Sequence, residues 1–233
     1  MTKAGVVGVV IAVDGPSGSG KSTTARGVAL RLGLRYLDTG AMYRALTWAM
    51  LRRGVDVDDA TAVTAVAADV VIEPGTDPVA PTITADGVDV AVPIRGPAVT
   101  RAVSSVSAVP AVRAALVELQ RRIIGSGDIV VEGRDIGSVV APEAQLKIFL
   151  VADATARAAR RTAELGGSND LVASTQQDME RRDRLDSSRP ASPLRRAVDA
   201  VVVDTTDMTL DEVVAHVVAL VPAGSATTEG VAP

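Results

Sequence analysis

The sequence predicts an α/β fold in which a buried parallel sheet is flanked by helices and interrupted by a small antiparallel insertion. Short β-branched strands alternate with helical stretches along most of the chain. The first strand, residues 6–13, is apolar almost throughout, as in strands that are buried on both faces of a parallel sheet. Residues 70–92 instead contain short β pieces separated by proline and glycine, which indicates the insertion.

A glycine-rich loop follows the first strand. Residues 15–22, GPSGSGKS, match G-x-x-x-x-G-K-[ST] at every fixed position, and a helical stretch continues to Gly33. Such glycines let backbone N–H groups turn toward a polyphosphate, and the helix N-terminus adds partial positive charge. Lys21 can reach the outer phosphates and Ser22 can ligate Mg²⁺. A loop that binds nothing would not need a lysine followed by a hydroxyl, so the pattern predicts a phosphate-binding loop.

Composition limits the possible classes of protein. The 233 residues exceed one domain of about 150 residues without requiring two, and 47% are hydrophobic, enough for a sizeable core. A net charge of −4 and 2% aromatic residues argue against a nucleic-acid partner. The absence of cysteine excludes disulfides and thiol chemistry, and no apolar run reaches the ~18 residues of a membrane span. We expect a cytoplasmic protein whose single histidine, His216, has no catalytic role.

The second strand, residues 35–37, leads into DTGAMYR at 38–44 and a helix over 41–52. Thr39 is the expected N-cap of this helix, and Arg44 lies near its first turn. An arginine beside a polar turn at a strand end suggests a second anion site. Taken alone, the pattern fits an ordinary capped helix with a solvent-facing Arg44 at least as well.

The middle of the chain contains the insertion and another strand end. After a helix at 58–69, the Asp86-Gly87 pair between alternating runs predicts a hairpin. Residues 56–91 hold eight acids and no base, so this insertion is expected to form a mobile flap or a substrate-side wall rather than to hold phosphates. Helices at 97–107 and 110–124 precede a strand at 128–132, which ends in Gly-Arg134-Asp135. Ligands gather at such strand ends, which favours a functional role over a surface ion pair.

Arginines are concentrated in the C-terminal third. A strand at 145–152 precedes helices from 155 and over 171–186, which are separated by a glycine-containing tip. Residues 157–196 hold nine arginines and six acids, which suits a lid that closes over phosphates, although several arginines also fit a solvated face. The last strand and helix are expected at 200–204 and 210–221, and 223–233 is expected to be a disordered tail.

Together these sites predict a reaction class. One phosphate loop with several remote arginines implies two anions held face to face, as in a kinase whose acceptor is itself charged. A phosphate monoester is already ionised near neutral pH, so its phosphorylation needs alignment and charge neutralisation rather than a base. The alternatives are another small-molecule kinase, of the UMP, AMP or shikimate type, or a nucleotide-binding switch that hydrolyses ATP without an acceptor.

Five ordered motifs carry a resemblance to a known family. GPSGSGKST, DTGAMYR, VVEGRDIGSVV, KIFLVA and RDRLDSSRPASPL together resemble bacterial cytidylate kinase over residues 6–221. The resemblance implies a monomeric P-loop kinase with a five-stranded parallel core, a monophosphate-binding region enlarged by the inserted sheet, and a helical lid. The implied parts are core at 1–57, 110–156 and 191–222, a monophosphate-binding region at 58–109, and a lid at 157–190. Its implied reaction transfers the γ-phosphoryl group of Mg·ATP to CMP or dCMP.

The resemblance also implies roles for individual residues. The ATP phosphates would be held by the loop and by two lid arginines, with Ser22 on the metal: Gly15, Pro16, Ser17, Gly18, Ser19, Gly20, Lys21, Ser22, Thr23, Arg157 and Arg161. Catalysis would fall to Lys21 and to an acceptor-phosphate clamp of Arg44, Arg134 and Arg189. The base would be read by Thr39, Arg113 and Asp135. The pentose would be contacted by Ser104, Arg182 and Asp186.

These residue types fit cytosine. Its N4 amino group donates and its N3 accepts, so a carboxylate with an arginine is complementary. Uracil reverses both positions and leaves unpaired polar groups, at about 1–3 kcal/mol each. Thr39 stands where the family often has serine, so a methyl is added beside the base. Asp14 is expected either to hold a Mg²⁺-bound water or to cap the loop.

Overall fold

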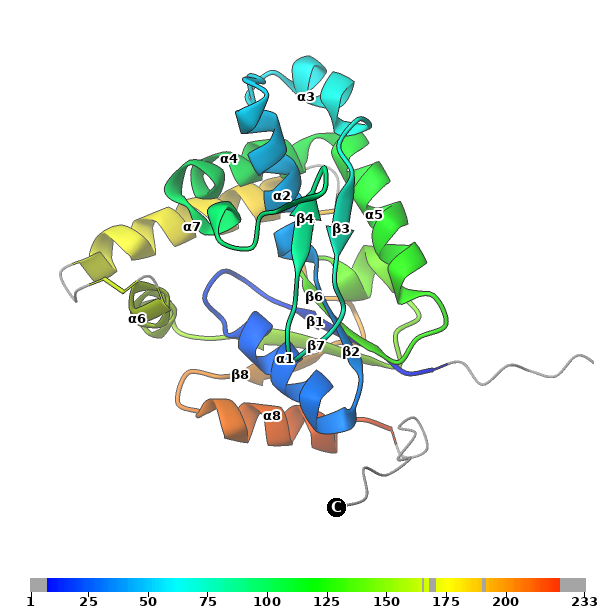
Figure 1. The fold of residues 1–233 in the computed structure, drawn as a ribbon. Coiled ribbons are helices and arrows are strands. Elements are labelled where there is room, and N and C mark those ends of the chain that lie inside the picture. Colours follow the sequence, from blue (N-terminus) through cyan, green and yellow to red (C-terminus); the bar gives the residue numbers. More distant parts are fainter. Residues whose placement is uncertain (1–7, 165, 168–170, 190–191, 223–233) are drawn as a thin grey trace, which may run out of the picture.

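A computed structural model describes residues 8–164, 166–167, 171–189 and 192–222 (Figure 1). Its main sheet has five parallel strands in the order β2-β6-β1-β7-β8, which confirms the predicted α/β class and strand number. The strands are β1 (Val10–Asp14), β2 (Arg35–Asp38), β6 (Ile129–Gly133), β7 (Leu146–Val151) and β8 (Val201–Asp204).

Helices cover both faces of this sheet. On one face lie α1 (Lys21–Leu32) and α8 (Leu210–Ala219), and on the other α2 (Thr39–Arg52), α4 (Pro97–Ala108) and α5 (Pro110–Ile124). Figure 1 places α3 (Ala60–Ala67) at the end of the molecule opposite α8, and the pair α6 (Ala154–Glu164) and α7 (Val172–Ser188) to one side. No single helix in the described ranges has the length and apolarity of a membrane span; only the pair α4–α5, bent by 94°, passes that test jointly.

The apolar character of the first strand follows from its central place. Ile11 and Val13 pack into the cluster under α1 and α8, whereas Val10 and Ala12 pack into the cluster on the opposite face. Because successive side chains of a strand point to opposite faces, a strand covered on both sides must be apolar at every position. The strand begins at Val10 rather than at the predicted residue 6, and residues 6–7 lie outside the described part of the chain, as does the predicted tail at 223–233.

The start of α2 corrects one prediction. The N-cap is Asp38, whose carboxylate accepts a hydrogen bond from the Ala41 backbone N–H at 2.8 Å. Thr39 is instead the first helical residue and its hydroxyl is engaged elsewhere. Asp and Thr both cap helices, but only the residue with extended backbone just before the helix can do so, and that residue is Asp38.

The predicted hairpin is confirmed. The insertion is a three-stranded antiparallel sheet of β3 (Ile72–Pro74), β4 (Ile83–Ala85) and β5 (Val88–Asp89), and Ala85 pairs with Val88 across the Asp86-Gly87 turn. Both turn residues have positive φ, 51° and 74°, as a two-residue hairpin of the primed type requires.

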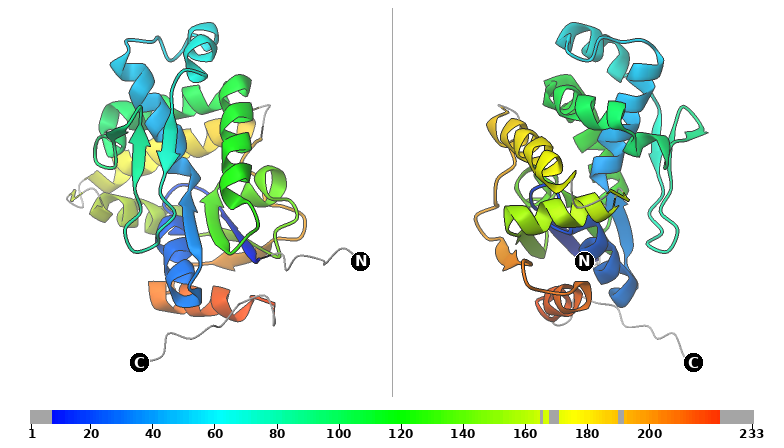
Figure 2. Two further views of the ribbon diagram at one scale, coloured as in Figure 1. Left: turned by 45° about the vertical axis from the view of Figure 1, so that its right-hand side comes forward. Right: turned by 90° about the vertical axis from the view of Figure 1, so that its left-hand side faces the viewer.

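The loop between β3 and β4 reaches back to the main sheet (Figures 1 and 2). The Arg26 guanidinium on α1 donates to the backbone carbonyls of Pro78 and Val79 at 2.6 and 2.7 Å. The Tyr36 backbone N–H donates to the Thr76 carbonyl at 2.9 Å, along the outer edge of β2. The β3–β4 loop is therefore joined to α1 and to β2 by hydrogen bonds.

Candidate active site

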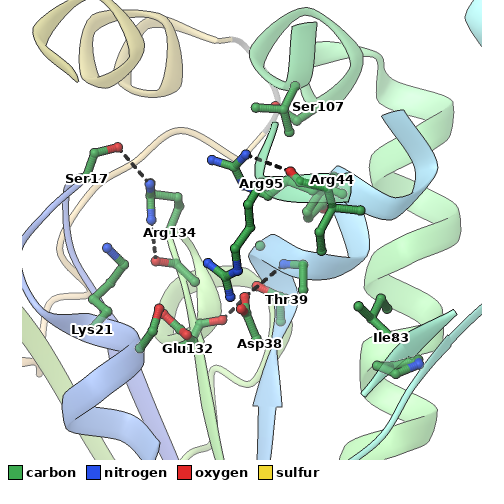
Figure 3. A pocket seen from close by; sticks show the side chains of 18 of the residues that line it. Ser17, Lys21, Asp38, Thr39, Arg44, Ile83, Arg95, Ser107, Glu132 and Arg134 are labelled. Carbon is green, nitrogen blue, oxygen red and sulfur yellow. Dashed lines mark hydrogen bonds between the residues drawn. The ribbon is translucent and has the colours of Figure 1, made fainter. Parts of the chain in front are cut away.

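Three neighbouring strands end at one edge of the sheet and bring the predicted site residues together. In the parallel register Asp38 of β2 lies opposite Glu132 of β6, and Gly133 of β6 lies opposite Asp14 of β1. The glycine loop, the Arg134 turn and the start of α2 therefore leave the sheet side by side, at the place where α/β folds bind ligands. They surround a cavity of about 760 Å³ (Figure 3).

Most of the residues that the sequence singles out line this cavity: Ser17, Gly18, Gly20, Lys21, Ser22, Thr23, Thr39, Arg44, Ser104, Arg113, Arg134, Asp135, Arg161, Arg182, Asp186 and Arg189. Gly15, Pro16, Ser19 and Arg157 do not line it. Pro16 and Ser19 instead build the back of the loop, because the Pro16 carbonyl accepts the Ser19 hydroxyl at 3.0 Å and the Lys21 ammonium at 2.6 Å.

The glycine loop presents its backbone to the cavity. Gly20 has a left-handed backbone, φ 82°, and no side chain caps the N-terminus of α1 that follows it. Unpaired N–H groups at a helix start, with the partial positive charge of the helix, form a site for an anion. Lys21 is buried beneath this loop, and burial and then the charge of Arg134 lower the pKa of its ammonium.

The two arginine-rich helices pack directly on the loop. Arg157 of α6 pairs with Asp183 of α7 at 2.5 Å and donates to the Ser17 carbonyl at 2.9 Å, while the Ser17 N–H donates to Asp183 at 3.0 Å. A Cβ at Gly18 would lie 2.8 Å from the Arg157 carbonyl oxygen. Arg157 thus holds the loop from behind, whereas Arg161 lines the cavity and pairs with Glu164 at 2.9 Å.

Several guanidinium groups share the centre of the cavity. Arg134 donates to Asp186 and to the Ser17 hydroxyl, both at 3.1 Å. Burial, followed by the charges of Arg182 and Arg161, lowers the pKa of Arg44 to about 9. Burial and the charge of Arg134 lower the pKa of Arg182 to about 10.

The positive charges around the cavity indicate which kind of ligand it can hold. All of these guanidinium groups stay protonated near neutral pH, so they repel one another across the cavity. An anion placed between them would relieve the repulsion and accept planar, charge-assisted hydrogen bonds. The arrangement suits a phosphate dianion better than a neutral ligand.

A buried ion pair lies beyond the arginines. Arg113 of α5 pairs with Asp135, and both side chains are about 5% exposed, at 4% and 6%. Arg113 also donates to the Ser107 carbonyl at 3.4 Å and lies over the Tyr43 ring at 5.3 Å. A guanidinium and a carboxylate fixed in this way offer a donor and an acceptor on one plane, which suits the edge of a heterocyclic base.

Comparison with known proteins identifies the family. A family model described as cytidylate kinase matches residues 11–223. The chain belongs to the cytidylate kinase family. A cytidylate kinase from Streptomyces avermitilis is 57% identical over 218 residues, which cover 93% of this chain and 94% of the relative. One from Streptomyces coelicolor is 58% identical over 91% of this chain and 92% of the relative. Among solved structures, a gluconokinase from Sinorhizobium meliloti 1021 is 18% identical, with a TM-score of 0.47, over 92% of this chain and 91% of that chain.

Two carboxylates in this cytidylate kinase family member were missed by the sequence analysis. Glu132 is buried in the cavity floor, accepts the Tyr36 hydroxyl at 2.6 Å, and has a pKa raised by burial and then by the charge of Asp38. The two carboxylates, Glu132 and Asp38, both line the cavity. Asp38 is the last residue of β2 and Glu132 the last polar residue of β6, and this place at a strand end was the available signal.

Asp14 does not line the cavity, and the glycine loop is not what it caps. Its carboxylate accepts the backbone N–H groups of Ile136 and Gly137 at 2.9 and 2.8 Å, so it caps the turn after β6, not the glycine loop itself. Burial raises the pKa of this carboxyl to about 6. Asp183 and Arg95 also belong to the site or its support; Asp183 lies within the RDRLDSSRPASPL motif but was given no role, and no motif contains Arg95.

Proposed function

We infer that this member of the cytidylate kinase family transfers the γ-phosphoryl group of ATP to CMP or dCMP. One observation carries the inference: the glycine loop and the arginine cluster face each other across a single cavity, with the Arg113–Asp135 pair beyond the arginines. Such a cavity has a binding site for a polyphosphate, a binding site for a second phosphate and a polar surface for a base, in that order. Relatives named cytidylate kinase share more than half of their residues with this chain.

The donor would lie on the glycine loop. The backbone of residues 15–23 and the start of α1 suit the ATP phosphates, and Lys21 would leave the Pro16 carbonyl to contact the outer ones. Arg161 lines the cavity and can reach the donor from the lid. Arg157 would act indirectly by fixing the Ser17 carbonyl.

The residues around Ser22 fit a divalent cation. Ser22 lines the cavity together with the buried Glu132 carboxylate, which burial and the nearby Asp38 destabilise in its charged form. A hydroxyl beside carboxylate oxygens is the hard oxygen environment that Mg²⁺ takes in nucleotide sites. We propose that Ser22 ligates Mg²⁺ and that Glu132 holds its water. Ser22 and Glu132 would hold the ion there, and it would supply positive charge that offsets the charge of the donor phosphates.

Arg44, Arg134 and Arg189 are proposed to hold the acceptor phosphate in line with the donor. An oxygen of that phosphate forms a bond to the γ-phosphorus while the bond from this phosphorus to the β–γ bridging oxygen breaks, and ADP leaves with the electron pair. Because the acceptor oxygen is already ionised, no protein group has to remove a proton. The arginines align the oxygen and stabilise the charge that spreads over the transferring group.

Base selection is proposed to rest on Thr39, Arg113 and Asp135. The Thr39 hydroxyl donates its proton to the Glu132 carbonyl at 2.7 Å, so only its lone pairs remain for a ligand. It can therefore accept from the N4 amino group of cytosine but cannot donate to the O4 of uracil. Asp135 accepts from the same amino group, and Arg113 donates to N3.

The pentose contacts are proposed to be Ser104, Arg182 and Asp186, all of which line the cavity. Asp186 also accepts from Arg134, so the pentose and the phosphate share one hydrogen-bonded group. We further propose that 58–109 acts as the acceptor-binding part and 157–190 as the lid on the remaining core. Because one chain carries both proposed substrate-binding sites, we propose that it works as a monomer. We propose that it acts in the cytoplasm, where its nucleotide substrates are.

An acceptor panel tests the proposal. ADP formation is measured with ATP, Mg²⁺ and CMP, dCMP, UMP, AMP or shikimate as acceptor, and ATP consumption is measured again without any acceptor. We expect CMP and dCMP to exceed every other acceptor, with negligible consumption in their absence. Faster turnover of UMP, AMP or shikimate would identify a different kinase, and acceptor-independent hydrolysis would identify a nucleotide switch.

A further inference from the structure

Arg95 is a cavity residue that the roles above do not include. It is the last residue of a short 3₁₀ turn, η1 (Pro93–Arg95), which connects the inserted sheet to α4. It lines the cavity, and Figure 3 draws its side chain running between Arg44 above and the Asp38 and Glu132 carboxylates below. Its charge acts on the Tyr36 hydroxyl, together with the charges of these two carboxylates. Arg95 therefore lies between the binding sites proposed for the two substrates.

The position of this arginine in the sequence is unusual. Arg95 and Arg101 are the only basic residues between Arg53 and Arg113. Arg101 lies on α4 and does not line the main cavity, whereas Arg95 does. The turn that follows the acidic insertion therefore directs one guanidinium into the cavity.

In the part of the chain that the structure describes, no hydrogen-bond or ion-pair partner gives the Arg95 guanidinium a structural role. Within the described ranges its guanidinium makes no hydrogen bond and no ion pair, although Asp38 and Glu132 lie near. By contrast Arg44, Arg113, Arg134 and Arg189 each donate to a protein oxygen. A cavity-facing guanidinium with all its donors free can bind an anion without first breaking an interaction.

Arg95 is also coupled to Arg44. The Arg44 guanidinium donates to the carbonyl of Ile94, the residue before Arg95, at 3.2 Å, so the turn that carries Arg95 is anchored by Arg44 itself. The positive charge of Arg95 is one of those that disfavour the charged form of Arg44. Arg44 is hydrogen-bonded to the turn that carries Arg95, and both side chains line the same cavity. Two cations placed in this way are arranged to share one anion.

We propose that Arg95 is a further catalytic residue, which contacts the acceptor phosphate opposite Arg44 and lies beside the oxygen that attacks the donor. The proposal rests on the function proposed above. It adds a contact from the turn between the inserted sheet and α4, so that the proposed acceptor-binding part supplies charge to the transferring group as well as shape. Such a contact would be made to the phosphate only and not to the nucleoside.

The test distinguishes a contact to the phosphate from a contact to the nucleoside. Binding of CMP and of cytidine, which lacks the phosphate, is measured by calorimetry for the wild type, Arg95→Ala and Arg95→Lys, alongside steady-state kinetics. We expect Arg95→Ala to weaken CMP binding by about tenfold or more, to leave cytidine binding unchanged, and to lower kcat by about 10²-fold. The KM for ATP should stay within about twofold. Arg95→Lys should keep part of the CMP affinity, since its charge remains but its fork is lost.

Arg101→Ala is the matched control, with the same loss of charge in the same part of the chain. It should keep the wild-type ratio of CMP to cytidine affinity. An unchanged ratio and kcat in Arg95→Ala would overturn the proposal, as would equal losses for CMP and cytidine or an equal effect of Arg101→Ala. If the wild type does not phosphorylate CMP, the proposed function fails, but the affinity ratio still decides whether Arg95 contacts the phosphate.

Discussion

The carboxylate of Asp14 accepts the backbone N–H of Gly137 at 2.8 Å, although 123 positions separate the two residues. Asp14 immediately precedes the glycine loop, and Gly137 closes the turn that begins with Arg134 and Asp135. The backbone proposed to hold the donor phosphates is thereby tied to the side chains proposed to hold the other nucleotide. We derive four predictions from this and related contacts.

The first prediction concerns the pH dependence of stability. Burial raises the pKa of Asp14 from 3.8 to about 6, so the folded chain holds this proton more tightly than the unfolded chain. The contribution of Asp14 is therefore complete below pH 3.8 and is lost as the pH rises through about 6. Relative to Asp14→Asn, the wild type should lose about 2 kcal/mol of unfolding free energy between pH 4 and 7. Urea unfolding of both proteins at several pH values measures this difference, and a difference that does not vary with pH contradicts it.

The second prediction concerns Asp135. Asp135→Asn keeps the size of the side chain but lets it donate, so the preference for CMP over UMP should fall by about 10- to 100-fold. The ratio of kcat/KM for the two acceptors measures it. Asp199→Asn is the control, because Asp199 pairs with Lys147 outside the cavity and is 65% exposed. Asp135→Ala is less informative, since it would leave the buried Arg113 without its partner and destabilise the fold. Equal ratios in wild type and Asp135→Asn would remove Asp135 from base selection.

The third prediction concerns Thr39. Thr39→Val replaces the cavity hydroxyl by a methyl of similar size, so CMP should lose an acceptor for its amino group and its KM should rise about tenfold. The matched control is Thr47→Val on the same helix, whose buried hydroxyl donates to the Tyr43 carbonyl at 2.8 Å and does not line the cavity. Both variants lose one hydroxyl bond, so comparable losses of stability are expected. A CMP KM that rises equally in both would show that the effect is structural.

The fourth prediction concerns contact between the lid and the loop. Gly18 has φ 71°, and a Cβ there would lie 2.5 Å from the Met179 side chain and 2.8 Å from the Arg157 carbonyl. Gly18→Ala should therefore displace α6 and α7, raise the KM for ATP by about tenfold, and lower kcat. Gly33→Ala also has a positive φ, 66°, but meets no atom within 4 Å, so it should lose about 1 kcal/mol of stability and no activity. Kinetics with ATP separate the two, and wild-type kinetics in Gly18→Ala would exclude a role for this packing.

Much of the fold could be predicted from local patterns. The all-apolar run that contains β1 and the Asp86-Gly87 pair reflect short-range rules, because burial on two faces and positive φ each restrict the residue types allowed. The candidate site was predictable where cavity residues directly follow a buried strand, as Arg134 and Asp135 do after β6. The capping of α2 by Asp38 was missed since adjacent Asp and Thr satisfy the same sequence rule.

The rest depends on distant parts of the chain. Asp183 reaches the Ser17 backbone across 166 positions, and Arg95 enters the cavity from a turn whose sequence, PIR, has no distinctive pattern. Arg157 fits a phosphate contact by sequence, but the packing of α6 turns it onto the loop backbone. Which arginines of a cationic segment face a ligand is decided by tertiary packing, and helical spacing alone cannot sort them.

The hydrogen bonds from Arg26 to the Pro78 and Val79 carbonyls have a consequence for communication within this chain. They fasten the inserted sheet to the helix that begins at Lys21, so any displacement of the insertion by one nucleotide pulls on the backbone that grips the other. We therefore expect binding at one proposed nucleotide site to change the affinity at the other within a single subunit.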